Sequence, residues 1–433
     1  MDSSDLDVLD PDEYFSDYDR RAQERRERRE RKSHRKIPRV RKRKPHSESL
    51  ASTPAGRVLI GAVGVLASAT VIGLLLLWPS GAARHTVHGF GHTTQATVTR
   101  SFIAPCGGPS ATRCRELDIT VSGAHSTVLL GPVSTTPAIA PGTPIRVSPV
   151  PLAHGQAAPP GYQPWQFVNI DRHGPLLWLA IALLLLAVIV IRLRGLLAAL
   201  GVGLSLLLLA KFLIPAILAG EAAVPVALVC ALAVMFITLI LTNGIGPQTL
   251  AAALGIGSTL LLTCLLALFA VHFAHIDGRT DELSTYLATV NPNISLQGIV
   301  LAGMIIGALG VLADIAVTQA SAVMVLRRTD PTLTPRGLYT SAFHVGRDHL
   351  SATIHTLVLA YAGASLPLLL ITHSTGVGFT DAISTQDIAQ PVIATLVGCI
   401  ALVCAVPLTT GLAALLVARV PARALQRVHA HAH

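Results

Sequence analysis

Long apolar runs alternate with short polar breaks along most of the chain, and this pattern predicts a membrane protein with about eight spanning helices. Each run is about 20 residues long, enough to cross ~30 Å of hydrocarbon as a helix. The predicted spans are Val58–Trp78, Pro175–Ile191, Leu196–Ala219, Ala222–Leu241, Leu250–Phe273, Gly298–Leu326, Leu350–Ile371 and Pro391–Val417. Residues 1–57 and 419–433 are then polar tails, and residues 175–418 form a domain of seven spans.

The segment 79–174, between the first two spans, has a different pattern. Its pieces TTQATVTRSFI, LDITVSG, STVLLGP and TPIRVSPV alternate apolar and polar residues with the period of strands, between turn residues. We expect a small extracytoplasmic β-barrel or sandwich of about four to six strands. The proline-rich end of this segment is interpreted as a linker, with Trp165 and Phe167 at the membrane interface.

The charges of the loops fix the predicted orientation. Basic residues cluster on one side of an eight-span arrangement, at Arg192, Arg194, Arg327, Arg328, Arg336, Arg347, Arg419, Arg423 and Arg427. Short cytoplasmic loops carry an excess of Lys and Arg, so this side and both termini are predicted to be cytoplasmic. The expected location is the plasma membrane.

The formal net charge of +9 arises largely from a basic block at residues 20–44, which follows an acidic stretch at residues 2–19. Such a block beside a span attracts anionic lipid headgroups, so we expect a disordered, lipid-contacting tail. An arm that binds nucleic acid or a protein is the alternative. The block has no interleaved aromatic residues, so nucleic acid is not the expected partner.

Two of the six cysteines, Cys106 and Cys114, lie in the β-rich segment. A disulfide is expected if that segment faces an oxidising compartment, while a two-cysteine metal site and free thiols are the alternatives. Cys230, Cys264, Cys399 and Cys404 lie in apolar runs, where cysteine usually behaves as a small hydrophobic residue.

Asp314 is the first candidate for function because it lies near the middle of a predicted span. A carboxylate at that depth costs several kcal/mol unless a cation, water, a partner or protonation compensates for it. One narrow face of the helix carries this acid and five small residues, at Gly303, Gly307, Gly310, Thr318 and Ser321. That face lacks bulk, so another helix can approach over the acid. A structural, hydrogen-bonded acid is the alternative to an ion or proton path.

Further polar residues in the spans complete a set of transport candidates: Lys211, His355, Tyr361 and Gln319. Lys211 either snorkels towards the interface or, if its helix tilts or breaks at Pro215, pairs with Asp314. His355 either forms a hydrogen bond between two helices or relays protons.

A cytoplasmic loop is predicted from Arg327 to His349, and it contains His344, Gly346, Arg347 and Asp348. Arg347 and Asp348 either cap the next span and pair with headgroups or belong to a gate or docking loop. On the opposite side, His272, His275, Asp277 and His373 form only a weak metal pattern, because metal sites need three or four convergent ligands. No metal or cofactor is predicted.

The segment from Gly307 to Leu370 resembles the YibE/F family of bacterial multi-pass membrane proteins. The residues that carry the resemblance are Gly307, Gly310 and Asp314, then the Gly346–Arg347–Asp348 motif, then Thr356, Leu357, Leu359, Ala360, Tyr361, Gly363 and Pro367. His344 and His355 depart from the asparagines of that pattern, which makes both positions titratable. The resemblance implies the fold and a transporter-like architecture.

These observations predict a proton- or ion-coupled transporter that uses Asp314. The alternative is a non-transporting envelope scaffold or assembly protein that acts through its extracytoplasmic β domain. No nucleotide-binding P-loop is present, only one carboxylate lies at depth, and no serine or cysteine lies in a nucleophile motif, so no enzyme is predicted. The expected partners are the bilayer and a small ion or solute, and the oligomeric state is left open.

Overall fold

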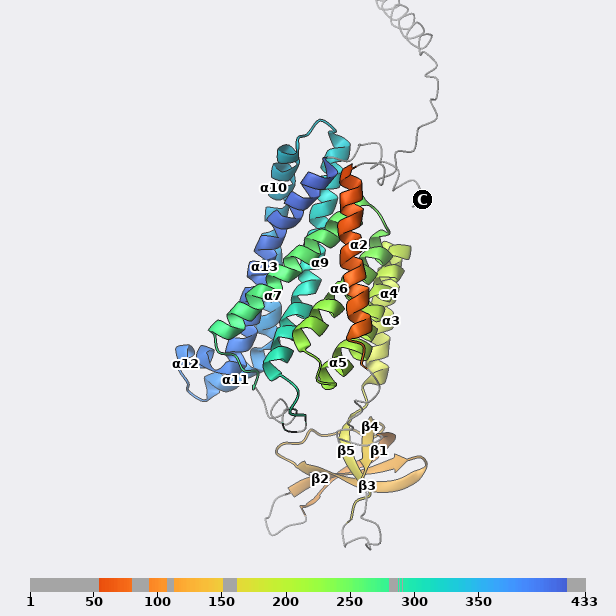
Figure 1. Ribbon diagram of the computed structural model, residues 1–433. Coiled ribbons are helices and arrows are strands. Elements are labelled where there is room, and N and C mark those ends of the chain that lie inside the picture. Colours follow the sequence, from red (N-terminus) through yellow and green to blue (C-terminus); the bar gives the residue numbers. More distant parts are fainter. Residues whose placement is uncertain are drawn as a thin grey trace, which may run out of the picture. The chain divides into compact units, whose positions relative to one another are not determined.

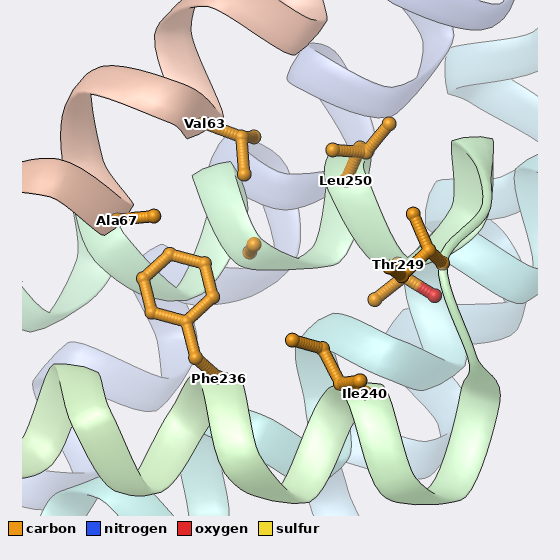
Figure 2. Close-up of a pocket in the computed structure, with 8 residues that line it drawn as sticks. Val63, Ala67, Phe236, Ile240, Thr249 and Leu250 are labelled. Atoms are coloured by element: carbon orange, nitrogen blue, oxygen red, sulfur yellow. The ribbon is translucent and has the colours of Figure 1, made fainter.

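The computed structural model describes residues 54–79, 93–106, 113–150, 162–279, 287, 289 and 291–418. Within these residues the chain is mostly helical and contains one small antiparallel sheet (Figure 1). The helices are α2 (Pro54–Leu76), α3 (His173–Ile191), α4 (Leu193–Leu208), the π-helix η2 (Leu209–Leu213), α5 (Ile214–Leu218), α6 (Ala223–Asn243), α7 (Pro247–Phe273), α9 (Leu296–Thr329), α10 (Pro335–Ala364), α11 (Leu366–Ser374), α12 (Phe379–Ser384) and α13 (Gln386–Val417). The predicted tails, before residue 54 and after residue 418, lie outside the described residues.

Among the described residues, 7 helices are long and apolar enough to cross a membrane, or up to 8 if α10 and α11 together make one span. That pair is bent by 55°, so the predicted span Leu350–Ile371 contains a break between two helices. The break falls where Ser365 ends α10 and Pro367, which cannot donate a backbone hydrogen bond, follows in the first turn of α11. The other predicted spans coincide with helices.

Helix α9 packs against four neighbours, α6, α7, α10 and α13 (Figure 1). Its inner side belongs to apolar clusters in which Met235, Ile256 and Ile305 are fully buried. Helix α3 is the opposite case, because it is apolar all round and has no buried residue. A helix with that surface is stable in lipid rather than in water, so the helical part is that of a membrane protein.

The span Leu193–Leu218 contains the π-helix, and Pro215 explains why. Proline has no backbone N–H, so the carbonyl of Lys211 cannot accept the usual bond from a residue four positions later. This turn of the helix therefore contains one extra residue, and the N–H of Ile214 donates to the carbonyl of Leu209, five residues earlier. Pro215 therefore produces a π-turn that contains Lys211, and the span Leu193–Leu218 continues through it without a break.

The sheet has five strands, β1 (Thr94–Pro105), β2 (Arg113–Val121), β3 (Ala124–Pro132), β4 (Pro144–Pro149) and β5 (Trp165–Ile170). Their order is β3-β2-β1-β4-β5, and every neighbouring pair is antiparallel. Alternate residues of the strands, including Val98, Leu117, Ile119 and Ile145, form an apolar core on one side of the sheet. The four alternating pieces of the sequence are thus β1 to β4.

The end of the predicted linker is instead part of a strand, because Trp165–Ile170 is β5, while residues 154–161 of that linker lie outside the described residues. Trp165 and Phe167 are partly buried and pack against the core of the sheet. Short strands beside proline-rich segments are hard to recognise, since their pairing depends on a distant partner, here β4. Cys106 and Cys114, at the β1–β2 connection, form a disulfide.

Candidate functional site

Asp314 of α9 lies beside a titratable residue of α10. Its Oδ2 atom is 3.6 Å from Nε2 of His349. The two side chains are 67% and 44% exposed in the chain by itself. In the described part of the chain, the acid is therefore not covered by a tightly packed helix.

His349 is in this position because α10 begins much earlier than the sequence suggested. Thr334 caps the helix by accepting a hydrogen bond from the N–H of Gly337, and Pro335 follows as the first helical residue. Both are common helix-start signals. Consequently the predicted loop from Arg327 to His349 is wrong, since only the residues between α9 and α10 are non-helical.

Helices α9 and α10 run in opposite directions, and two further contacts show their alignment. Gly346 of α10 lies against Gln319 of α9, so that a methyl group there would be 2.7 Å from the amide carbon of Gln319. Near the other end of the two helices, the hydroxyl of Tyr361 lies beside Gly307. It is 3.0 Å from the position that a Cβ atom would take at Gly307. Asp314 and His349 fall between these contacts.

Gln319 is fully buried and is the polar centre of this helix group. Its Oε1 atom accepts a hydrogen bond of 2.8 Å from the hydroxyl of Thr410 on α13. Its Nε2 atom has no partner among the described residues. The hydroxyl of Thr409, also fully buried, lacks a hydrogen bond as well and faces Gly255 of α7. Unpaired buried polar atoms are rare in native proteins and indicate strain or function.

Part of the small-residue face of α9 is not covered by its neighbours. No described atom lies within 4 Å of a methyl group placed at Gly303 or Gly310, whereas Gly307 has Tyr361 beside it. Thr318, one turn after Asp314, donates from its hydroxyl to the carbonyl oxygen of Asp314 at 2.7 Å. The face predicted from the spacing therefore exists, and it is open around the acid.

The remaining candidates do not join this site. His344 and His355 bond through Nδ1 to carbonyl oxygens of their own helix, those of Thr340 and Ser351, each at 2.7 Å.

Two other charged candidates are exposed on α10, Arg347 and Asp348, and neither has an ion pair within the described part of the chain. Lys211 is exposed on the π-turn and has no ion pair there either. The residues that the structure describes include no group of three or more His, Cys, Asp or Glu that could hold a metal ion.

Sequence reasoning named Asp314, Gln319 and Tyr361 but missed His349 and Thr410 as site residues. The sequence did contain a signal that His349 lies on a helix. Thr334–Pro335 marks a helix start, and no further proline interrupts the helix Pro335–Ala364. No local signal pointed to Thr410, since threonines on apolar helices commonly bond their own backbone.

Comparisons with known proteins give one finding. The family described as YibE/F-like protein matches residues 179–419, which is more than half of the chain. No curated protein and no solved structure matches the chain. The match includes α9, α10 and α13, so every residue of the site lies within it.

Proposed function

Since the chain belongs to the YibE/F family, we propose that this membrane protein moves a proton or a small cation by way of the Asp314–His349 pair. The observation that carries the proposal is the 3.6 Å approach of an acid and an imidazole from two different apolar helices. Each group changes charge on taking up one proton, so their interaction depends on which of them holds it.

The place of the pair along α9 supports a role inside the bilayer. At 1.5 Å per residue, Asp314 lies about 27 Å from the first residue of α9 and about 22 Å from the last. If the middle of α9 lies at the middle of ~30 Å of hydrocarbon, Asp314 is still more than about 10 Å from either headgroup region, so the carboxylate needs a local partner. The imidazole of His349, 3.6 Å away, is the partner that the described residues supply.

Access to the pair also supports the proposal. Both side chains are partly exposed, and the space around Gly303 and Gly310 is not filled by described residues. An ion-binding acid sealed between helices would have no entry path, and the described neighbours do not seal Asp314.

The test uses a strain that lacks the protein, on a growth or solute-uptake phenotype that the deletion produces. Complementation with Asp314→Asn or His349→Gln is expected to give at least a tenfold lower uptake rate than the unaltered chain, because neither variant can complete the proton exchange. The matched control is Asp348→Asn, an exposed acid next to His349 without an ion pair among the described residues, and it is expected to behave as the unaltered chain. Full uptake with Asp314→Asn, in protein shown to reach the membrane, would contradict the proposal.

A second candidate function, a scaffold or assembly role without transport, is favoured by the sheet. It has its own apolar core and an exposed opposite side, so it can act as a working surface. This candidate predicts that removal of the sheet abolishes the phenotype while Asp314→Asn leaves it unchanged, which is the reverse of the transport outcome.

A further inference from the structure

The path of the chain through the sheet is that of a known ligand-binding barrel. Strands β1, β2 and β3 form a meander, β4 returns to pair with β1, and β5 pairs with β4. The two outer strands also approach each other, because the N–H of Leu129 on β3 donates to Oε1 of Gln163, just before β5, at 2.6 Å. This is the strand order of the OB-fold, a partly open five-stranded barrel whose outer face over strands 2 and 3 binds oligonucleotides and oligosaccharides.

The outer face over β1 and β2 carries an aromatic ring among charged groups. The register places Phe102 opposite Glu116 and Arg100 opposite Asp118. The guanidinium carbon of Arg100 lies 5.9 Å from the centre of the Phe102 ring. Arg100 is exposed, the other three side chains are partly buried, and none of the four belongs to the apolar core of the sheet. They are therefore free to meet a ligand.

Neutral hydrogen-bonding groups continue this face onto β3. Thr120 of β2 lies opposite His125 of β3, with 3.4 Å between the hydroxyl oxygen and Nδ1. A second hydroxyl, that of Thr99, lies 3.2 Å from the same Thr120 oxygen. Glu116 and Asp118 form no ion pair with any described residue, so their oxygens can accept hydrogen bonds from a ligand.

We propose that this outer face, centred on Phe102, Arg100, Glu116 and Asp118, binds an uncharged oligosaccharide. The guanidinium of Arg100 covers one face of the ring, which leaves the rest of its apolar surface for the C–H side of a pyranose, while the carboxylates accept from sugar hydroxyls and the guanidinium donates to them. A nucleic acid fits less well, because its phosphates require an excess of cations, and here two carboxylates accompany one guanidinium. This inference goes beyond the proposed transport function and does not depend on Asp314.

The test measures binding of two probes, cellohexaose and chitohexaose, to the full-length protein in lipid nanodiscs by saturation-transfer difference NMR. At least one probe is expected to bind saturably. Phe102→Ala is expected to weaken that binding at least tenfold, and Glu116→Gln severalfold. Gln166→Ala, an exposed polar residue of β5 outside the face, is the matched control and is expected to change nothing.

Phe102→Leu keeps most of the side-chain volume but removes the ring, so it tests stacking even if the alanine variant fails to fold. Retained affinity in a folded Phe102→Leu variant would overturn the proposal, as would the absence of saturable binding by both probes. A third overturning result is binding of a dT12 oligonucleotide that neither sugar displaces, because that outcome assigns the face to nucleic acid.

Discussion

At the scale of single residues, small side chains decide which polar groups can meet. Gly346 is the smallest residue on the inner side of α10, and the amide of the fully buried Gln319 fills the space above it. One turn further along α10, His349 then lies beside Asp314. The glycine of the Gly346–Arg347–Asp348 motif therefore has a packing role, which brings α10 close enough to α9 for the pair to form.

Substitution Gly346→Ala is expected to lower the free energy of unfolding by about 1–3 kcal/mol, because the added methyl overlaps the Gln319 amide and overpacks the interface. In a Gln319→Ala background the same change is expected to cost far less, which a double-mutant cycle on thermal unfolding in detergent measures. Gly363→Ala, at a position of α10 with open space around it, is the control. Strictly additive effects of the two substitutions would contradict this account of Gly346.

Asp171, at the end of β5, gives a pH-dependent prediction for the sheet. Its carboxylate is held by the backbone N–H and the ring of His173 and by Arg146, and these partners keep the pKa of Asp171 below its ordinary value. A lowered folded-state pKa stabilises the fold above the unfolded-state pKa of about 3.9, and the gain is lost as the pH falls through the folded-state value.

We therefore expect Asp171→Asn to lower the melting temperature of the sheet at pH 7, with a difference from the unaltered chain that shrinks below about pH 4. Fluorescence of Trp165, which packs on the core of the sheet, follows the transition once Trp78 and Trp178 are replaced by phenylalanine. A difference that is the same at pH 7 and pH 3 would show that the charge of Asp171 does not contribute.

At the scale of elements, one arginine ties three chain segments together. Arg327, in the last turn of α9, donates to the carbonyl oxygens of Pro331 and Leu333 in the following turn, at 2.6 and 3.1 Å. It also donates to the carbonyl of Ala418 at the end of α13, at 3.2 Å. A cation is favourable at the carboxyl end of a helix, and the planar guanidinium of Arg327 reaches both the end of α13 and the turn after α9. Arg327 thus fixes where α10 begins relative to α13.

Arg327→Ala is expected to destabilise the helical part by about 2 kcal/mol, the usual cost of losing hydrogen bonds to a charged group. Arg327→Lys is expected to recover only part of this, because one ammonium cannot reach both the turn after α9 and the end of α13. The measurement is chemical unfolding in detergent, with the exposed Arg336→Ala as the control. Equal stability of the lysine variant and the unaltered chain would mean that charge alone, without the geometry of the fork, is sufficient.

At the scale of the whole molecule, the number of crossings depends on the bent pair α10–α11. If the pair crosses the membrane despite its 55° bend, the loop before α10 and the loop after α11 face opposite sides. If the pair turns back, both loops face the same side, and the positive loops no longer share one compartment. The eight-span arrangement is the one that keeps the basic loops together.

This arrangement predicts opposite labelling of Thr332→Cys and Thr375→Cys in a background without the free cysteines 230, 264, 399 and 404. In intact cells, a membrane-impermeant maleimide is expected to modify the cysteine at 375 and to modify the one at 332 only after lysis. Both positions are exposed, so burial does not hide either of them. Labelling of both in intact cells, or of neither, would favour seven crossings.

The amino-acid sequence by itself determined the elements whose signal is local. Runs of apolar residues predicted the spanning helices, alternation predicted β1 to β4, and the residues around Asp314 and Gly346 indicated the family that residues 179–419 match. These features need no knowledge of distant neighbours, because length, hydrophobic period and motif spacing are properties of a short stretch of chain. The tertiary structure decided the rest: β5 depends on pairing with β4, and the bond from Thr410 to Gln319 depends on how α13 packs. The approach of His349 to Asp314 likewise required α10 to lie along α9, since contacts between helices are set by the packing of whole faces rather than by any local run of residues.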